Sequence, residues 1–287
     1  MRKPPIRDWH LLNGRILDAV PAASVRARGS HDARQLSQAH WLLRRKRDGR
    51  FLASLDDSGR MQPMHWQARR HDSALAGFVF DLESGHLPDT LATDRTQTLL
   101  DLLGVPADYG ERHGLALVAE PGVLWFGGFD RYRRALWLQA DAAAAWRRMR
   151  TAARAEGVVL EAISGFRSHD YQLGIFQRKL ARGQDVDEIL AVNAAPGFSE
   201  HHSGRALDLS SPGEPAAEES FEDTAAFGWL GERAADFGFA MSYPRDNPHG
   251  IVYEPWHWYY LGTAWAMPAS RMPDSAVPSQ NPQRKSR

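Results

Sequence analysis

Residues 205–210 read Arg-Ala-Leu-Asp-Leu-Ser and alternate in the two-residue period of a β-strand. In that period the two leucines share one face and pack on a core, whereas Asp208 points to the opposite face. Gly204 precedes the run and lets the chain turn, so that His201 can approach Asp208. The pattern predicts a strand with one buried face and one face that carries an acid beside an imidazole.

A second segment, residues 253–260, reads Tyr-Glu-Pro-Trp-His-Trp-Tyr-Tyr and also predicts a strand. Glu254 lies before this strand, where Pro255 fixes the backbone and removes a donor. A straight strand would put Glu254 and His257 on opposite faces. A bend at the proline is therefore needed if both side chains are to reach one metal ion.

The chain has no cysteine, which excludes disulfides and thiolate ligands, so any zinc site must use histidines and carboxylates. His201, Asp208 and His257 form a three-ligand set that leaves one position open for water. A carboxylate that does not bind the metal, such as Glu254, then takes the proton of the metal-activated water. Taken alone, the same residues also fit core histidines and a capped turn, so the metal site is a hypothesis at this point.

The rest of the chain predicts an α+β organisation. In order, the patterns indicate β-hairpins around Trp41–Leu43 and Phe51–Leu55, an alanine-rich helix from Asp141 to about Gly157, a strand at Val158–Ile163, a helix capped by Ser168 that runs to Gly183, a helix from about Asp223 to Phe237, and an extended segment at Trp256–Leu261. Strands that alternate with helices in this order favour a sheet that carries the site.

Charge is unevenly distributed although the formal net charge is zero. Residues 1–70 hold 15 Lys or Arg against 6 Asp or Glu, whereas residues 184–254 hold 3 against 14. A basic N-terminal third can approach polyanions, so a wall- or nucleic-acid-binding protein is one alternative. We favour a solvated basic face and expect no nucleic-acid partner.

Neither a secretory signal nor a membrane span is expected. The basic residues at the N-terminus are followed by polar residues rather than an apolar run, and no run reaches transmembrane length. We therefore expect a cytoplasmic protein. Residues 268–287 contain few large apolar residues, and we expect this tail to be disordered.

At the metal-site residues the sequence closely resembles the zinc D-alanyl-D-alanine carboxypeptidases of the VanY type, which are related to the VanX dipeptidases and to the hedgehog signalling domain. The signature Ser-x-His-x-x-Gly-x-Ala-x-Asp is matched at residues 199–208, and Glu-x-x-His is matched at residues 254–257. Residues 164–168, Ser-Gly-Phe-Arg-Ser, resemble the family's Ser-Gly-Tyr-Arg-Ser segment. The resemblance extends from about residue 110 to 265 and implies a hedgehog/DD-peptidase-like α+β domain with a central antiparallel sheet.

The resemblance also implies a role for each matched residue. It makes His201, Asp208 and His257 the Zn2+ ligands, Glu254 the general base, Arg167 the group that stabilises the oxyanion or holds substrate, and Gln172, Ser199 and Tyr243 residues of the substrate pocket. His202 occupies a variable position of the signature and is expected not to bind the metal.

The expected organisation is an accessory region with some β-structure at 1–95, a zinc carboxypeptidase domain at 96–267, and the tail. The resemblance implies hydrolysis of the C-terminal peptide bond of peptidoglycan stem peptides, with no membrane span. The excess of carboxylates in residues 184–254 favours peptides that carry a free amino group, such as a diaminopimelate or lysine side chain. The alternatives are an L,D-carboxypeptidase, a peptidoglycan endopeptidase of the same fold, and a zinc-bearing binding module without turnover.

Overall fold

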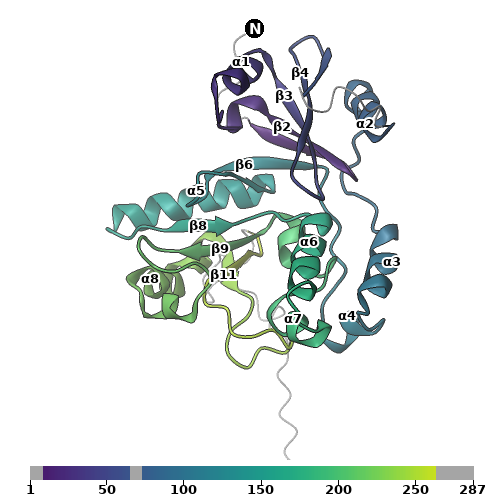
Figure 1. Cartoon of the computed structure of the whole chain (residues 1–287). Coiled ribbons are helices and arrows are strands. Elements are labelled where there is room, and N and C mark those ends of the chain that lie inside the picture. Colours follow the sequence, from purple (N-terminus) through teal and green to yellow (C-terminus); the bar gives the residue numbers. More distant parts are fainter. Residues whose placement is uncertain (1–8, 65–72, 263–287) are drawn as a thin grey trace, which may run out of the picture.

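The computed structural model describes residues 9–64 and 73–262, so the prediction for the tail at 268–287 lies outside the described residues. One end of the molecule is a seven-stranded antiparallel sheet with the strand order β5-β4-β3-β2-β1-β6-β7 (Figure 1). Its strands are β1 (His10–Asn13), β2 (Leu17–Pro21), β3 (Trp41–Arg45), β4 (Phe51–Leu55), β5 (Met61–Pro63), β6 (Val123–Phe129) and β7 (Ala135–Leu138).

The hairpins expected in the N-terminal region are confirmed. β3 pairs with β4 and β4 pairs with β5, both antiparallel. The connecting turns contain Gly49 and Gly59, whose φ angles of 68° and 79° lie in the region that glycine adopts without steric cost. Three helical segments accompany these strands: η2 (Ala22–Ser24), α1 (Ser30–Gln38) and α2 (Ser73–Ser84).

The seven-stranded sheet runs across the boundary expected near residue 95. β1 pairs with β6, which aligns His10 with Trp125 and Leu12 with Val123. The N-terminal strands and the segment that leads into the candidate site thus share backbone hydrogen bonds. Pairing between strands so far apart in sequence is a non-local contact, whose loop-closure entropy must be offset by the packing that it brings.

A second antiparallel sheet of four strands, in the order β10-β11-β9-β8, holds the segments that carry the predicted site. Its strands are β8 (Glu161–Ser164), β9 (Ala206–Ser210), β10 (Phe239–Met241) and β11 (His257–Tyr260). This sheet and its surrounding helices confirm the α+β class and the central antiparallel sheet. The strand expected from Val158 begins later, at Glu161.

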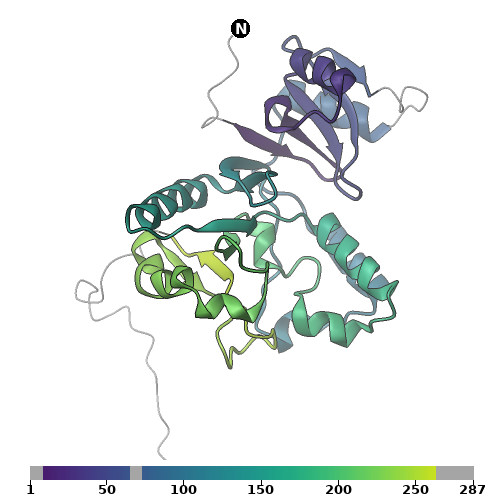
Figure 2. The same ribbon diagram turned by 60° about the vertical axis from the view of Figure 1, so that its left-hand side comes forward.

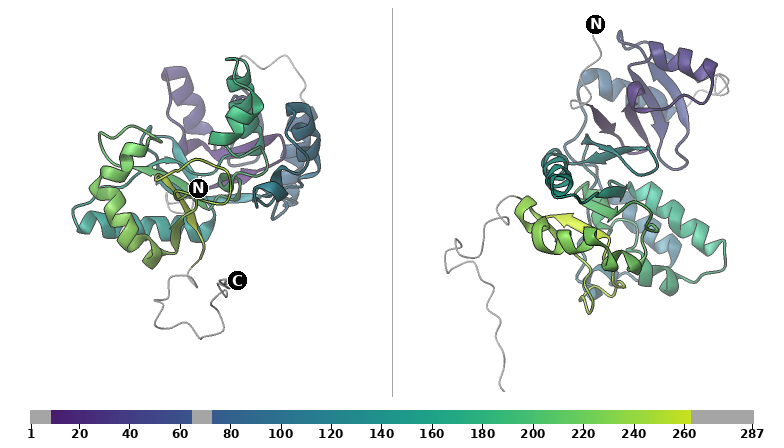
Figure 3. Two further views of the ribbon diagram at one scale, coloured as in Figure 1. Left: turned by 90° about the horizontal axis from the view of Figure 1, so that it is seen from below. Right: turned by 90° about the vertical axis from the view of Figure 1, so that its left-hand side faces the viewer.

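The apolar face of this sheet is covered by helices. Leu207, Leu209, Trp258 and Tyr260 share one hydrophobic core with the completely buried Trp146. The covering elements are α5 (Ala140–Ala155), η4 (Glu219–Asp223), α8 (Ala225–Arg233) and η5 (Ala234–Phe237). Figure 3 (right) shows α5 nearly end-on between the two sheets. The alternation in residues 205–210 has therefore buried both leucines and left Asp208 on the other face.

Helices from two parts of the chain flank the polar side of the small sheet (Figure 2). They are α3 (Asp94–Leu103), α4 (Tyr109–Arg112), α6 (His169–Leu180) and α7 (Val186–Val192). α6 starts where predicted, because the Ser168 hydroxyl accepts the backbone N–H of Tyr171. No helix in the described ranges is long and apolar enough to cross a membrane.

Candidate metal centre and active site

Strand pairing brings the two predicted metal-binding segments together. β11 pairs with β9 so that His257 lies directly opposite Asp208. His201 comes from the 3-10 helix η3 (Glu200–Ser203), which ends at Gly204 with a φ angle of 70°. Gly204 thus makes the turn between the helix and β9 that the sequence predicts.

His201, Asp208 and His257 each offer one ligand atom, and these atoms lie within 4.8 Å of one another. Asp208 Oδ1 is 3.2 Å from His201 Nε2 and 3.2 Å from His257 Nδ1. All three residues are buried. Two imidazoles and a carboxylate in this arrangement are the donor set of a catalytic zinc site with an open position.

The far nitrogen of each imidazole is fixed by a hydrogen bond. His201 Nδ1 donates to the Gly165 carbonyl at 2.7 Å, which leaves Nε2 as the ligand atom. His257 Nε2 donates to Glu200 Oε2 at 2.8 Å, which leaves Nδ1 facing Asp208. Glu200 in turn accepts the Ser242 hydroxyl at 2.7 Å. Such outer contacts orient metal-binding histidines, so the residues present fit zinc.

The charges at this centre favour a cation. Burial lowers the pKa of His257, but its hydrogen bonds to Asp208 and Glu200 outweigh burial and raise that pKa to about 10. Burial, together with the Arg167 charge, lowers the pKa of His201 to about 4. Asp208 and Glu200 therefore stabilise a positive charge on His257. The same two carboxylates would stabilise a metal ion bound to His257 Nδ1.

Glu254 stands beside the three ligand residues without joining them. The bend expected at the proline is present, because the His257 N–H donates to the Glu254 carbonyl at 3.1 Å. Glu254 Oε2 consequently lies 3.8 Å from His257 Nδ1. Burial raises the pKa of the Glu254 carboxyl to about 7, which suits a group that takes and returns a proton.

A cavity of about 290 Å³ opens on the centre, and every predicted site residue lines it. Arg167 Nη2 lies 3.9 Å from Asp208 Oδ2. The ring of Tyr243 packs 4.8 Å from that of His257, centroid to centroid. Besides the metal-centre residues and Glu254, the predicted residues on its wall are Arg167, Gln172, Ser199 and Tyr243.

Two residues that line this cavity each carry a buried polar atom that is unsatisfied. Arg167 Nε and Gln172 Oε1 have no hydrogen-bond partner among the described residues. A buried donor or acceptor without a partner is costly, so such atoms are typically satisfied by a ligand. The Gln172 amide nitrogen donates to the Ala194 carbonyl at 2.9 Å, which fixes the amide oxygen in place.

His202 does not belong to the metal group, in agreement with its variable position in the signature. Its Nδ1 donates to the Arg167 carbonyl at 2.6 Å, and its Nε2 accepts the Gly197 N–H at 3.1 Å. Both ring nitrogens are therefore used in holding the backbone of neighbouring loops.

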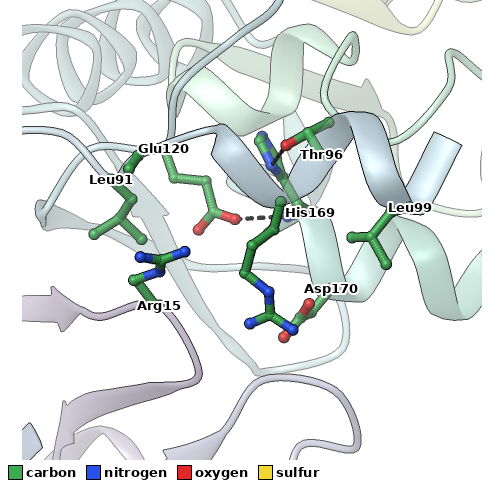
Figure 4. A pocket seen from close by; sticks show the side chains of 9 residues that line it. Arg15, Leu91, Thr96, Leu99, Glu120, His169 and Asp170 are labelled. Carbon is green, nitrogen blue, oxygen red and sulfur yellow. Dashed lines mark hydrogen bonds between the residues drawn. The ribbon is translucent and has the colours of Figure 1, made fainter.

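Behind the cavity, the N-terminal region contacts the start of α6. Glu120 Oε1 accepts the backbone N–H of His169 at 2.7 Å (Figure 4). Its other oxygen accepts Lys46 Nζ at 2.5 Å and Asn13 Nδ2 at 2.9 Å. Arg167 lies two residues before His169, so strands β1 to β3 are linked to the helix start that positions it.

The sequence did not indicate two residues, one that contacts the metal centre and one on the cavity wall. Glu200 occupies a variable position of the signature, and its contact with His257, 57 residues away in the sequence, depends on the pairing of β9 with β11. Lys179 lines the cavity from the end of α6. The only sequence signal for Lys179 is its spacing of seven residues from Gln172, which places both on one helix face.

Comparisons with known proteins give a consistent result. A model of the VanY family, described as D-alanyl-D-alanine carboxypeptidase, matches residues 135–263. The chain is 33% identical over 191 residues to the putative carboxypeptidase YodJ of Bacillus subtilis, covering 64% of the chain and 69% of that protein. It is 34% identical over 121 residues to a D-alanyl-D-alanine carboxypeptidase of Enterococcus faecalis, covering 39% of the chain and 43% of the relative.

Solved structures with similar segments include the LdcB LD-carboxypeptidase, at 37% identity and a TM-score of 0.42. That match covers 45% of the chain and 62% of LdcB. VanYB in complex with D-alanine-D-alanine matches at 30% identity and a TM-score of 0.39, covering 46% of the chain and 75% of VanYB.

Proposed function

The chain belongs to the VanY family of D-alanyl-D-alanine carboxypeptidases and is a hydrolase of that class, and we propose that it removes the C-terminal residue from peptidoglycan stem peptides. The observation that carries this proposal is the convergence of His201, Asp208 and His257, with Glu254 3.8 Å from His257. A binding module without turnover would have no need for a carboxyl group that is only 13% exposed beside these three side chains.

We assign the metal ligands to His201 Nε2, Asp208 and His257 Nδ1. When bound there, zinc supplies Lewis acidity, which polarises the carbonyl of the cleaved bond and makes water a better nucleophile. Gly165 and Glu200 keep the two imidazoles in the tautomers that present these nitrogens. Asp208 also neutralises part of the positive charge that collects here.

Glu254 moves the proton. In its ionised form it takes a proton from the water whose oxygen attacks the carbonyl carbon, and it gives that proton to the amine nitrogen as the C–N bond breaks. A pKa of about 7 allows the same carboxyl group to do both near neutral pH. Burial, which raises this pKa, also keeps bulk water from competing for the proton.

Arg167 and Gln172 bind the substrate. The Arg167 guanidinium offers a planar fork of donors to the oxyanion or to the terminal carboxylate. Arg167 and Gln172 both line the cavity, and each has a buried polar atom without a partner among the described residues, which a peptide substrate would satisfy. Ser199 and Tyr243 complete this wall.

Mass spectrometry of defined stem peptides tests the proposal. The zinc-loaded protein is incubated with a pentapeptide that ends in D-alanyl-D-alanine and with the matching tetrapeptide and tripeptide, with a chelated sample as control. We expect loss of one residue from the pentapeptide alone. Shortening of the tetrapeptide would assign an L,D-carboxypeptidase instead, an internal cut would assign an endopeptidase, and no cleavage with zinc would leave a binding module.

A further inference from the structure

The catalytic cavity contains a second cation far from the metal centre. Lys179 lines the same cavity as Arg167 and His257 and stands near the end of α6. Gln172 and Lys179 are seven residues apart, so about 10 Å of helix separates the metal end of the cavity from the lysine. Residues at this spacing lie on one face of a helix.

The Lys179 ammonium lacks a counter-charge. It makes no hydrogen bond or ion pair with any residue that the structure describes, and burial of the side chain, with no carboxylate to offset it, lowers its pKa. Lysines on a protein surface usually extend into water. Lys179 is instead half-buried in the wall of a cavity that must admit a ligand.

The same cavity also has apolar groups on its wall. Val192 and Val252 line it and are 40% and 43% exposed. The Val252 N–H donates to the Ala191 carbonyl at 3.2 Å, so the two valines belong to segments that are joined. A ligand with both aliphatic parts and a negative group fits a wall that carries valines and a lysine.

The orientation of the bound peptide in the cavity follows from the proposed function, on which this inference rests. A carboxypeptidase leaves only one residue beyond the cleaved bond, and Arg167 stands beside the metal centre to hold its terminal carboxylate. The cavity that leads to Lys179 must then hold the acyl side. An extended peptide advances about 3.3 Å per residue, so about 10 Å corresponds to the third residue before the cleaved bond.

We propose that Lys179 is a specificity-determining residue that binds a free carboxylate on the third residue of the acyl side. The preferred substrates are then peptides with two carboxylates, one at the C-terminus and one near the start of the bound segment.

Steady-state kinetics with two matched peptides tests this. The peptides differ only at the third residue before the cleaved bond, which carries either a free carboxylate or its amide. We expect wild type to prefer the carboxylate peptide about tenfold in KM, because one charge-assisted hydrogen bond contributes roughly that much. Lys179→Met should abolish the preference with kcat unchanged, and Lys179→Arg should retain it. Arg178→Met, which removes a neighbouring charge that does not line the cavity, is the control.

The inference is overturned if Lys179→Met raises KM equally for both peptides, or raises KM for neither. Calorimetry separates this failure from failure of the proposed function. Both peptides are titrated into the zinc-loaded full chain carrying Glu254→Gln, with and without Lys179→Met. If the wild type cleaves neither peptide but the lysine still gives tighter binding of the carboxylate peptide, then the proposed function fails and the subsite stands. Equal binding of both peptides excludes the subsite.

Discussion

At the scale of single residues, Glu254 separates metal binding from proton transfer. Glu254→Gln keeps the shape of the side chain but cannot accept a proton. We expect kcat to fall about 10²- to 10⁴-fold, the usual contribution of a general base, with zinc content unchanged. Peptide-cleavage kinetics and metal analysis of the same sample check this. The control is Glu218→Gln, since Glu218 is an exposed acid. Activity near that of wild type would remove Glu254 from the mechanism.

Glu200 acts through His257 and not on the substrate. Its carboxylate accepts His257 Nε2–H at 2.8 Å and is held by Ser242. Glu200→Gln should weaken zinc binding about 10- to 100-fold, since loss of an outer carboxylate has this effect on metal sites. Competition with a chromophoric chelator measures it. Zinc affinity equal to that of wild type would show that Glu200 does not orient the ligand.

The sequence predicted the three residues that the structure brings together, whereas it did not indicate Glu200 or Lys179. His201, Gly204 and Asp208 lie within eight residues, so local strand and turn geometry already brings His201 near Asp208. His257 was expected from its match to the family's Glu-x-x-His segment. Glu200 reaches His257 only through the pairing of β9 with β11, and Lys179 depends on the packing of α6 beside that sheet. Such contacts are set by tertiary structure, and spacing in the sequence does not predict them.

At the scale of elements, the turn between η3 and β9 depends on Gly204. Its φ angle is 70°, and an added Cβ would lie 2.5 Å from Leu124 Cδ2 and 3.1 Å from the Gln139 nitrogen. Strain in the left-handed region costs about 1–2 kcal/mol, and overpacking costs about 1–3 kcal/mol more. Gly204→Ala should therefore lower the free energy of unfolding by at least about 2 kcal/mol.

Urea unfolding of a matched variant isolates the packing contribution at Gly204. Gly213 has a similar φ angle of 86°, but nothing lies within 4 Å of a Cβ added there. Gly213→Ala should therefore show the backbone strain alone. Equal destabilisation by the two variants would mean that the close approach of Leu124 to the turn does not matter.

Local sequence patterns predicted where helices and strands begin better than they predicted how far a helix extends. The alternation of residues 205–210 and the Ser168 cap correctly predicted β9 and the start of α6. The helix expected from Asp223 to Phe237 is present as two pieces, α8 and η5, with η4 before them. Helix type near a chain turn depends on packing against α5 and the small sheet, which periodicity does not report.

At the scale of the whole molecule, the N-terminal region is joined to the catalytic part by strand pairing and by a buried ion pair. The pairing of β1 with β6 joins strands more than a hundred residues apart, so no local pattern could predict it. The side chains of Lys46 and Glu120 are 2% and 5% exposed. We expect deletion of residues 1–95 to remove the β1 partner of β6 and to leave Glu120 without the Lys46 cation.

This ion pair gives stability a defined pH dependence. Burial would raise the pKa of Glu120, but the Lys46 and His169 charges and the hydrogen bonds hold it below its ordinary value of 4.5. A depressed carboxyl pKa contributes stability above the unfolded value, and that stability is lost as pH falls through the folded value. The melting temperature should drop as pH falls below about 4.5. Glu120→Gln should be less stable at pH 7 and should show a shallower drop on acidification; an equally steep drop would exclude Glu120 as its source.

The central claim is that three separated side chains share one metal ion. The most direct measurement is anomalous X-ray diffraction at the zinc edge from crystals of the zinc-loaded protein. The account predicts one strong peak between His201 Nε2, Asp208 and His257 Nδ1, with zinc–nitrogen distances of about 2.0–2.1 Å. The absence of a peak there, or a peak elsewhere with no metal bound to these three side chains, would contradict the claim that they share one metal ion.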